Sequence, residues 1–416
     1  MAKHDHQTPA VVLYMSYSGL AIVRSLGKKN IPVYAMDPDK NQIGMNSRYC
    51  ESFVCPSVEE NERRHVDFLI DFAKKLKTKP VLYATGDNTV LCYAKYEDEL
   101  KNYFYYTSDK KENVYRTVPK INMYETAVEL GIDVPKSYIP RNQSELKGIF
   151  DDLKKPFILK PSYSNTWYVK EMAQLVSNQK CIVINDYDEL CSWYDVLSKN
   201  KNEFILSEIV PGPDENLYYV PSYRTRDGKY LGIFVGQKVR VTPVHFGSAS
   251  YVELCKRSEL EILTKQILDK LNYVGLSGVE YKYDETDEKY KLIEINARYG
   301  LWDCLGEKIG IDLAYIAYCD VLGIENGLNV VQQPEDKKKV AWLSFERDIN
   351  AFREYRRENN IEIVSWLKTL MNVKKYSVFD IWDLSPYLSR VRRNFFDKYA
   401  RYFLKKIPGL SLVRGN

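Results

Sequence analysis

Apolar and polar positions near the start of the chain follow the order strand, helix, strand. An apolar run at 10–15 precedes apolar residues at helical spacing over 20–26, and a second apolar run at 33–36 ends in polar residues. The order returns at 65–84, where a helical pattern precedes a short apolar run. This alternation predicts an α/β domain with an open parallel sheet over about residues 1–115.

Polar residues follow the predicted strands of this domain at their carboxyl ends. In open α/β sheets ligands bind beyond those ends, so we expect ligand-facing side chains there. The candidates are Ser16, Ser18, Asp37, Thr85 and Asp87. Helix capping and turn formation explain the same residue types equally well. The first turn lacks the G-x-G-x-x-G pattern, which argues against a dinucleotide-binding oxidoreductase.

Two lysines stand out in the middle of the chain. Lys120 opens a helical pattern that stops at Gly131, and Lys160 lies near the end of a buried strand pattern at 156–161. A lysine after an apolar strand is well placed to contact a phosphate group as a point charge. In isolation, such a lysine more often extends along the surface from a strand end. The polar loop 162–167 could wrap phosphates, although it contains no glycine.

A further strand pattern at 204–207 runs into the turn 208–212. An extended segment of this kind offers backbone N–H and C=O groups to an adenine edge. Glu215, just beyond the turn, could accept hydrogen bonds from both ribose hydroxyls. Antiparallel strand patterns follow at 217–223, 231–235 and 238–241.

The most polar strand pattern ends in a carboxylate, an amide and a guanidinium. Because side chains alternate along a strand, Glu294, Asn296 and Arg298 share one face. Fourteen residues before Glu294, Glu280 lies on another strand pattern, and the polar turn between them predicts a hairpin that pairs the two glutamates. Two carboxylates and an amide oxygen suit Mg²⁺. Taken alone, the pattern is more often a hairpin with a solvated polar face.

Length and composition narrow the class of protein. A chain of 416 residues predicts two or three domains, and its net charge of +4 does not indicate nucleic acid as a partner. The eight cysteines form no C-x-x-C pair, which disfavours a zinc site and fits reduced thiols. We find neither an apolar run near 18 residues nor a secretory signal at the N-terminus. The expected location is therefore the cytoplasm.

After residue 326 the composition changes, which predicts a C-terminal extension over 326–416. Its strand pattern at 340–345 precedes a charged helix pattern at 350–359. The stretch 390–406 holds seven basic residues and one acidic residue, with aromatic residues at helical spacing. A basic amphipathic helix can lie on the anionic inner face of a membrane. The alternative, which we favour, is a helix packed on the body with a solvated basic face.

The order of these motifs resembles the ATP-grasp superfamily over roughly residues 8–325. The motifs that carry the resemblance are Pro119-Lys120, Gly131-Ile132-Asp133-Val134-Pro135, Ile158-Leu159-Lys160-Pro161, Ser207-Glu208-Ile209-Val210-Pro211-Gly212 with Glu215, Gly278-Val279-Glu280 and Glu294-Ile295-Asn296-Ala297-Arg298. No single motif is specific, but several in the right order with the right gaps are.

The resemblance implies an α/β protein with the ATP-grasp fold. An N-terminal pre-domain (1–115) precedes an ATP-grasp domain (116–325), whose small lid (about 150–212) clasps ATP against an α+β part; the extension is helical. The implied ATP-binding residues are Lys120, Lys160, Ser207, Glu208, Ile209, Val210 and Glu215. The implied ligands for Mg²⁺, or Mn²⁺ in its place, are Glu280, Glu294 and Asn296.

Within the superfamily the chain looks most like the carboxylate–amine ligase branch related to D-aspartate ligase and the large subunit of carbamoyl-phosphate synthase. The features are Ser18-Gly19-Leu20-Ala21, Ser47-Arg48-Tyr49 and Gln237-Lys238-Val239-Arg240 followed by Pro243 and Gly247. This branch implies catalytic roles for Lys238, Arg240 and Arg298, with the arginines holding the substrate carboxylate and the developing oxyanion.

The implied reaction joins a carboxylate to an amine through an acyl phosphate and releases ADP and phosphate. The partners would be small-molecule substrates, with cell-envelope or polysaccharide precursors as one setting, and a homodimer is left open. A second hypothesis is a degenerate ATP-grasp protein that binds nucleotide for regulation or assembly without turnover. The glycine-poor loop 162–167 is the feature that favours it.

Overall fold

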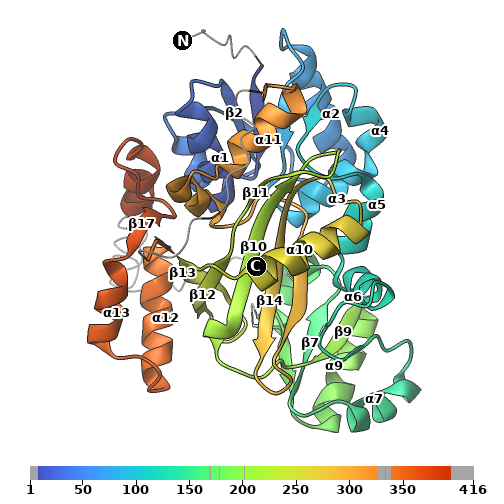
Figure 1. The fold of residues 1–416 in the computed structure, drawn as a ribbon. Coiled ribbons are helices and arrows are strands. Elements are labelled where there is room, and N and C mark those ends of the chain that lie inside the picture. Colours follow the sequence, from blue (N-terminus) through green and yellow to red (C-terminus); the bar gives the residue numbers. More distant parts are fainter. Residues whose placement is uncertain are drawn as a thin grey trace, which may run out of the picture.

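The structure, a computed structural model, describes residues 8–167, 170–177, 179–200, 202–325, 333 and 339–394. Its described strands form three sheets that succeed one another along the chain (Figure 1). The predicted α/β architecture with a parallel sheet, a small sheet and a larger third sheet is therefore confirmed.

The first sheet is the predicted open parallel sheet, with strand order β3-β2-β1-β4-β5. Its central strand is β1, all four residues of which are buried, as the apolar run requires. The strands are β1 (Ala10–Leu13), β2 (Val33–Asp37), β3 (Glu51–Val54), β4 (Val81–Tyr83) and β5 (Tyr105–Tyr106). The helices of this part are α1 (Tyr17–Gly27), α2 (Glu62–Lys74), α3 (Asp87–Lys95), α4 (Glu97–Leu100) and α5 (Lys111–Thr117).

The second sheet is small and antiparallel, with strand order β6-β9-β7-β8. Apolar residues of its strands pack with α7 and α9 around a core of their own that includes Trp167. Its strands are β6 (Ser137–Tyr138), β7 (Phe157–Pro161), β8 (Ile182–Ile184) and β9 (Phe204–Glu208). The associated helices are α6 (Lys120–Glu129), α7 (Leu146–Asp152), α8 (Lys170–Leu175) and α9 (Tyr187–Lys199).

The third sheet is the largest, with strand order β15-β14-β10-β12-β13-β16-β17 and β11 paired to β10. Its first strands are β10 (Leu217–Arg224), β11 (Tyr230–Ile233), β12 (Gly236–Thr242), β13 (Ser248–Leu254), β14 (Gly275–Asp284) and β15 (Lys289–Asn296). Helices α10 (Ser258–Lys270) and α11 (Leu313–Leu322) accompany them. The predicted hairpin is present, and Glu280 lies directly opposite Glu294 in its register.

The C-terminal segment extends this third sheet, since β16 (Ala341–Leu343) pairs with β13 and β17 (Val373–Tyr376) pairs with β16. The predicted strand ends at Leu343, and α12 (Phe345–Arg357) begins five residues earlier than the predicted helix start at 350. Helix α13 (Ile363–Leu370) follows. Most of the predicted basic helix at 390–406 lies outside the described residues. Within the described part of the chain, no helix is long and apolar enough to cross a membrane.

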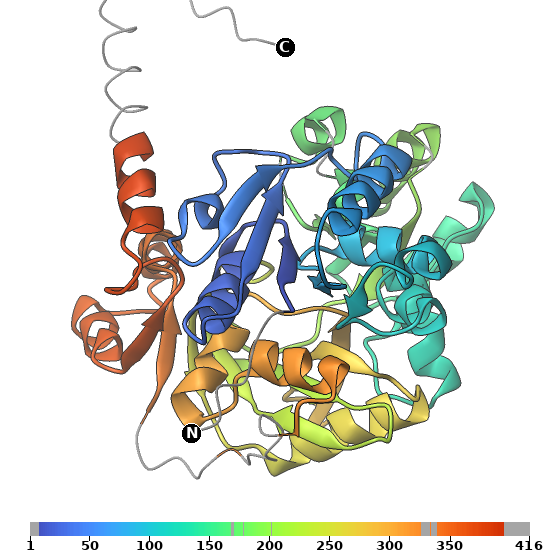
Figure 2. The same cartoon turned by 90° about the horizontal axis from the view of Figure 1, so that it is seen from above.

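Figure 2 shows the C-terminal segment beside the first part of the fold. Within this segment, the buried Asp383 contacts α1 and the loop before β3. Its carboxylate accepts hydrogen bonds from Arg24 Nε at 2.8 Å, from the Ser47 hydroxyl at 2.8 Å and from the Arg48 backbone N–H at 3.0 Å. The first and third sheets also share two apolar cores. Residues at the ends of β4 and β15 are thereby held in fixed positions relative to each other.

Candidate functional site

A cavity of about 590 Å³ is lined by residues from all three parts of the fold. The first part contributes the start of α3, the small sheet contributes β7 and β9, and the third sheet contributes β12, β14 and β15. Ten of the predicted site residues line it: Lys120, Lys160, Glu208, Ile209, Val210, Lys238, Glu280, Glu294, Asn296 and Arg298. Predicted site residues up to 178 positions apart in sequence, as Lys120 and Arg298 are, therefore face one cavity.

The acidic centre of the cavity is the register pair Glu280 and Glu294. The Lys238 ammonium forms an ion pair with the Glu280 carboxylate, and Asn296 Nδ2 donates a hydrogen bond to Glu294 Oε1 at 2.9 Å. No group of three or more His, Cys, Asp or Glu side chains suited to a metal ion occurs in the described part of the chain. A metal here would rest on two carboxylates and the amide.

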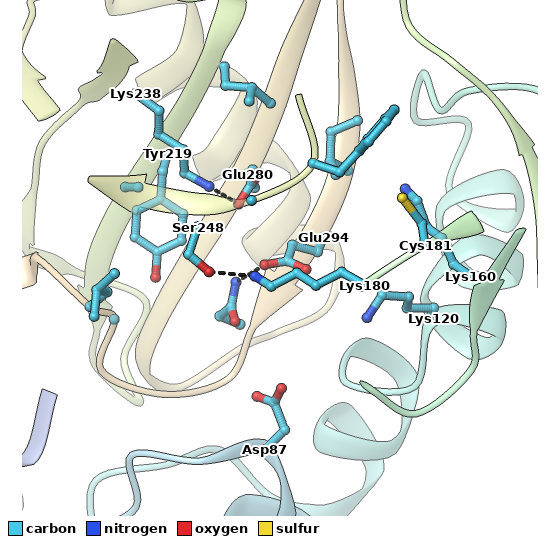
Figure 3. A pocket seen from close by; sticks show the side chains of 18 of the residues that line it. Asp87, Lys120, Lys160, Lys180, Cys181, Tyr219, Lys238, Ser248, Glu280 and Glu294 are labelled. Atoms are coloured by element: carbon cyan, nitrogen blue, oxygen red, sulfur yellow. Dashed lines mark hydrogen bonds and ion pairs between the residues drawn. The ribbon is translucent and has the colours of Figure 1, made fainter. Parts of the chain in front are cut away.

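Lysines surround this acidic centre (Figure 3). Burial opposes ionisation of Glu294, but Lys120 and Lys238 outweigh it and hold the pKa of that carboxyl at about 2. Burial also lowers the pKa of the Lys160 ammonium. Close to the Glu280–Glu294 pair, four lysines outnumber the two carboxylates, which suits an anionic ligand such as a polyphosphate. The other charged lining residues are Lys282 and Arg298 against Glu59, Asp87 and Glu208.

Lys180 is the fourth of these lysines, and its place in the cavity was not predicted from the sequence. It lies between α8 and β8 and donates a hydrogen bond to the Ser248 hydroxyl of the third sheet. Figure 3 shows its side chain extending across the cavity toward Glu294. The signal was present in the sequence, because Lys180 adjoins an apolar strand just as Lys160 does.

Arg298 reaches the cavity together with Asp87 of the first part of the fold. Arg298 Nε donates to Asp87 Oδ1 at 2.6 Å, and this contact raises the pKa of the guanidinium against the effect of burial. Asp87 is the first residue of α3 and lines the cavity, as expected for a residue beyond β4. The other four candidates in the first part, Ser16, Ser18, Asp37 and Thr85, are not among the lining residues.

Of the residues predicted to bind adenine and ribose, Glu208, Ile209 and Val210 line the cavity, and Ser207 and Glu215 do not. Ser207 is buried within the small sheet, where its hydroxyl lies 2.7 Å from that of Ser137. Glu215 is exposed outside the cavity lining, and its backbone carbonyl accepts a hydrogen bond from Gln237 Nε2 at 2.8 Å. The structure therefore does not bring Ser207 and Glu215 into the cavity.

Arg240 is likewise absent from the cavity lining, contrary to the expectation of a substrate contact. Its guanidinium binds the buried Asp348 carboxylate of α12 through Nε at 2.8 Å and Nη2 at 3.0 Å. The register of β12 shifts between Lys238 and Arg240. Because of this irregularity, side chains two residues apart no longer face the same way, and Lys238 enters the cavity without Arg240.

Tyr219 forms part of the cavity wall and lies across Gly278 of the neighbouring strand. A Cβ atom at Gly278 would stand 1.7 Å from the Tyr219 hydroxyl oxygen. Tyr219 is directly opposite Glu280 in the β10–β14 register, so the absence of a side chain at Gly278 makes room for the ring beside the acidic centre. Gly278 was predicted only as part of a motif, and Tyr219 was not predicted as a site residue.

We expect Gly278→Ala to displace the Tyr219 ring and to lower the free energy of unfolding by about 1–3 kcal/mol, the usual cost of overpacking a buried site. Chemical denaturation followed by fluorescence measures this change. Gly148→Ala on α7 is the matched control, because an added Cβ there meets no atom within 4 Å. It should be neutral or stabilise by about 0.5–1 kcal/mol. Equal stability of both variants would contradict the packing argument.

Comparisons with known proteins agree with this architecture. The family model described as "Carbamoyl-phosphate synthase L chain, ATP binding domain" matches residues 237–325. D-aspartate ligase from Enterococcus faecium (strain Aus0004) is 22% identical over 343 residues, covering 78% of this chain and 79% of the relative.

Two solved structures illustrate the likeness in fold. The ADP complex of N5-carboxyaminoimidazole ribonucleotide synthetase has a TM-score of 0.64 at 14% identity, covering 84% of this chain and 85% of the other. The L-amino acid ligase from Bacillus licheniformis has a TM-score of 0.60 at 12% identity, covering 80% of this chain and 79% of the other. The three sheets thus form an α/β protein with the ATP-grasp fold. Residues 237–325 carry the likeness to the ATP-binding domain of the carbamoyl-phosphate synthase L chain.

Proposed function

We propose that this protein is an ATP-dependent ligase that joins a carboxylate to an amine and forms ADP and phosphate. One observation carries the proposal: Lys120 of α6 and Lys160 of β7 line the same cavity as the Glu280–Glu294 pair. The sequence relative named D-aspartate ligase and the structural neighbour named L-amino acid ligase support the same class of reaction.

ATP would span the cavity from the small sheet to the third sheet. The backbone at Glu208 to Val210 would contact the adenine, and Lys120, Lys160 and Lys180 would contact the phosphates. Glu280, Glu294 and Asn296 would hold Mg²⁺, because they offer hard oxygen donors and the Glu294 carboxyl is ionised. The Glu280 carboxylate would exchange its ion pair with Lys238 for the metal ion. The bound ion would neutralise phosphate charge during transfer.

The chemistry requires activation of the carboxylate, since its oxygen is a poor leaving group. Transfer of the γ-phosphoryl group to the carboxylate forms an acyl phosphate, and the amine then displaces phosphate from the acyl carbon. The residues contribute position and charge neutralisation. Arg298 is the guanidinium that would hold the substrate carboxylate, because it lines the cavity and Arg240 does not.

The test is phosphate release by the purified protein with Mg-ATP and a panel of protein amino acids, D-aspartate and dicarboxylic acids, each offered with amines. We expect at least one carboxylate–amine pair to give ADP, phosphate and an amide identified by mass spectrometry. Formation of AMP in place of ADP would contradict the acyl-phosphate route.

The second candidate is a protein that binds ATP without turnover. The buried Trp167 at the end of the loop 162–167 favours it, because this bulky side chain lines the cavity where a flexible phosphate loop would close. Nucleotide binding measured by calorimetry, with no product from the whole panel, would establish this alternative.

Cellular location, substrate class and assembly can also be proposed. We infer a cytoplasmic enzyme that acts on small molecules, with envelope or polysaccharide precursors among its candidate substrates. Peripheral membrane contact through residues 390–406 and assembly as a homodimer remain predictions from the sequence. Vesicle flotation with anionic lipids and light scattering of the full-length protein test them separately.

A further inference from the structure

Behind one wall of the cavity lies a buried carboxylate that the proposed phosphoryl transfer does not use. Asp303 is 1% exposed, and its Oδ1 atom has no hydrogen-bond partner in the described part of the structure. Its other oxygen, Oδ2, accepts a hydrogen bond from the Gly300 backbone N–H at 2.6 Å. An ionisable group that keeps one oxygen unpaired inside a fold is costly unless a ligand or a proton uses that oxygen.

Tyr219 presents a second unpaired atom to the same place. Its hydroxyl is buried and likewise has no partner among the described residues, and Figure 3 shows it turned away from Lys238 and Glu280. A Cβ atom at Gly300 would lie 2.5 Å from both the Tyr219 hydroxyl oxygen and Asp303 Oδ1. The two oxygens are therefore no more than about 5 Å apart, a gap that one hydrogen-bonded atom bridges.

Tyr219 and Asp303 lie at the end of the cavity that holds Arg298. Tyr219 and Gly300 both line the cavity, and Asp303 lies directly behind them. Gly300 follows Arg298 by two residues, so the pair lies near the guanidinium that would hold the substrate carboxylate. The proposed reaction needs a proton acceptor for the amine, because an ammonium ion has no lone pair with which to attack.

We propose that Asp303, acting through the Tyr219 hydroxyl, accepts a proton from the substrate ammonium and so makes this wall of the cavity the amine subsite. The proposal deepens the proposed ligase function and rests on it. In the step, the Tyr219 oxygen takes a proton from R–NH₃⁺ while its own hydroxyl proton moves to Asp303 Oδ1 through one water molecule that would bridge the two oxygens. The products are R–NH₂, an unchanged tyrosine and a neutral Asp303 carboxyl.

The second proton lost by the amine nitrogen and the proton held by Asp303 need no further protein group. The neutral amine attacks the acyl phosphate, the C–O bond to phosphate breaks, and the proton lost by nitrogen leaves with the phosphate as HPO₄²⁻. Asp303 returns its proton to solvent after product release. No oxidant or additional reactant is required.

The charged surroundings of Asp303 suit a group that gains and loses a proton near neutrality. Burial raises the pKa of its carboxyl to about 7, opposed by the Gly300 N–H and by the positive charge of Arg298. The other titratable groups that interact with it are Tyr219, Tyr299 and Cys304, and burial raises the pKa of each, so all three stay neutral at pH 7. A base works best when its pKa lies near the working pH.

The experiment compares an ammonium substrate with hydroxylamine, which is largely uncharged at neutral pH and needs no base. Wild-type protein, Asp303→Asn and Tyr219→Phe are given Mg-ATP and each carboxylate of the panel, with either the amine substrate or hydroxylamine. We expect both variants to lose about 10²-fold in amide formation at pH 7 and to keep hydroxamate formation within a few-fold of wild type. Wild-type amide formation should rise with pH through about 7.

Tyr299→Phe is the matched control, because the Tyr299 hydroxyl is also buried and unpaired among the described residues but its side chain does not line the cavity. It should retain both reactions. Equal loss of amide and hydroxamate in Tyr219→Phe, or no loss relative to Tyr299→Phe, would overturn the proton-transfer role. A wild-type protein that forms no hydroxamate with any carboxylate would instead overturn the ligase function, and the amine subsite with it.

Discussion

Glu294→Gln is expected to lower ATP-dependent product formation by at least about 10²–10³-fold, the range found when one preorganised hydrogen-bond donor is removed from a reaction centre. The substitution keeps size and shape but removes the negative charge that Lys120 and Lys238 stabilise. It also removes one of the two carboxylates suited to Mg²⁺. Steady-state kinetics with phosphate-release detection measure the change. In a Mg²⁺ titration, the variant should need a higher Mg²⁺ concentration for half-maximal activity.

The fold should survive this change. Glu294 is only partly buried, and the amide oxygen of the substituted side chain can still accept the hydrogen bond from Asn296 Nδ2. Glu259→Gln is the control, because Glu259 is an exposed residue of α10 outside the cavity lining. Turnover of Glu294→Gln equal to that of Glu259→Gln would contradict a role for Glu294 in the reaction and would favour nucleotide binding without catalysis.

The sequence predicted those parts of the fold that follow from periodicity alone. The apolar run at 10–15 became the central strand of the parallel sheet, and the polar turn after Asp284 closed the hairpin that pairs Glu280 with Glu294. Both depend on local patterns, namely a buried strand read as a continuous apolar run and a register fixed by a short turn. The resemblance of the ordered motifs to the ATP-grasp superfamily then placed these elements in one fold.

The errors at the site have one physical cause: contacts between distant elements decide where a side chain points. Regular alternation put Arg240 beside Lys238, but a register shift in β12 separates them and α12 supplies a partner for the arginine. Glu215 lies near the hinge in sequence, yet its side chain is exposed to solvent. Tyr219 gave no signal of its own, because its position in the wall depends on a glycine 59 residues later.

Loss of the Asp348 carboxylate, the buried partner of Arg240, is expected to lower the stability of the fold strongly. Asp348 is fully buried and accepts hydrogen bonds from Arg240, from the Ser250 hydroxyl at 3.0 Å and from Trp366 Nε1 of α13 at 2.8 Å. Asp348→Ala leaves the Arg240 guanidinium buried without its carboxylate. We expect the free energy of unfolding to fall by about 3–5 kcal/mol, the usual result of breaking a buried ion pair on one side.

The loss should begin where Asp348 joins α12 and α13 to the third sheet. Hydrogen exchange followed by mass spectrometry should show faster exchange in α12, α13 and β16 and little change in the first sheet, while denaturant unfolding gives the overall loss. Replacing both partners, Arg240→Met with Asp348→Leu, leaves no uncompensated charge and should recover most of the stability. This double variant also decides the role of Arg240. It should retain ATP-dependent turnover if the arginine holds α12 in place, and it should lose turnover at recovered stability if Arg240 contacts substrate. Lys238 lines the cavity and Arg240, two residues later, does not. We therefore expect the double variant to recover turnover together with stability.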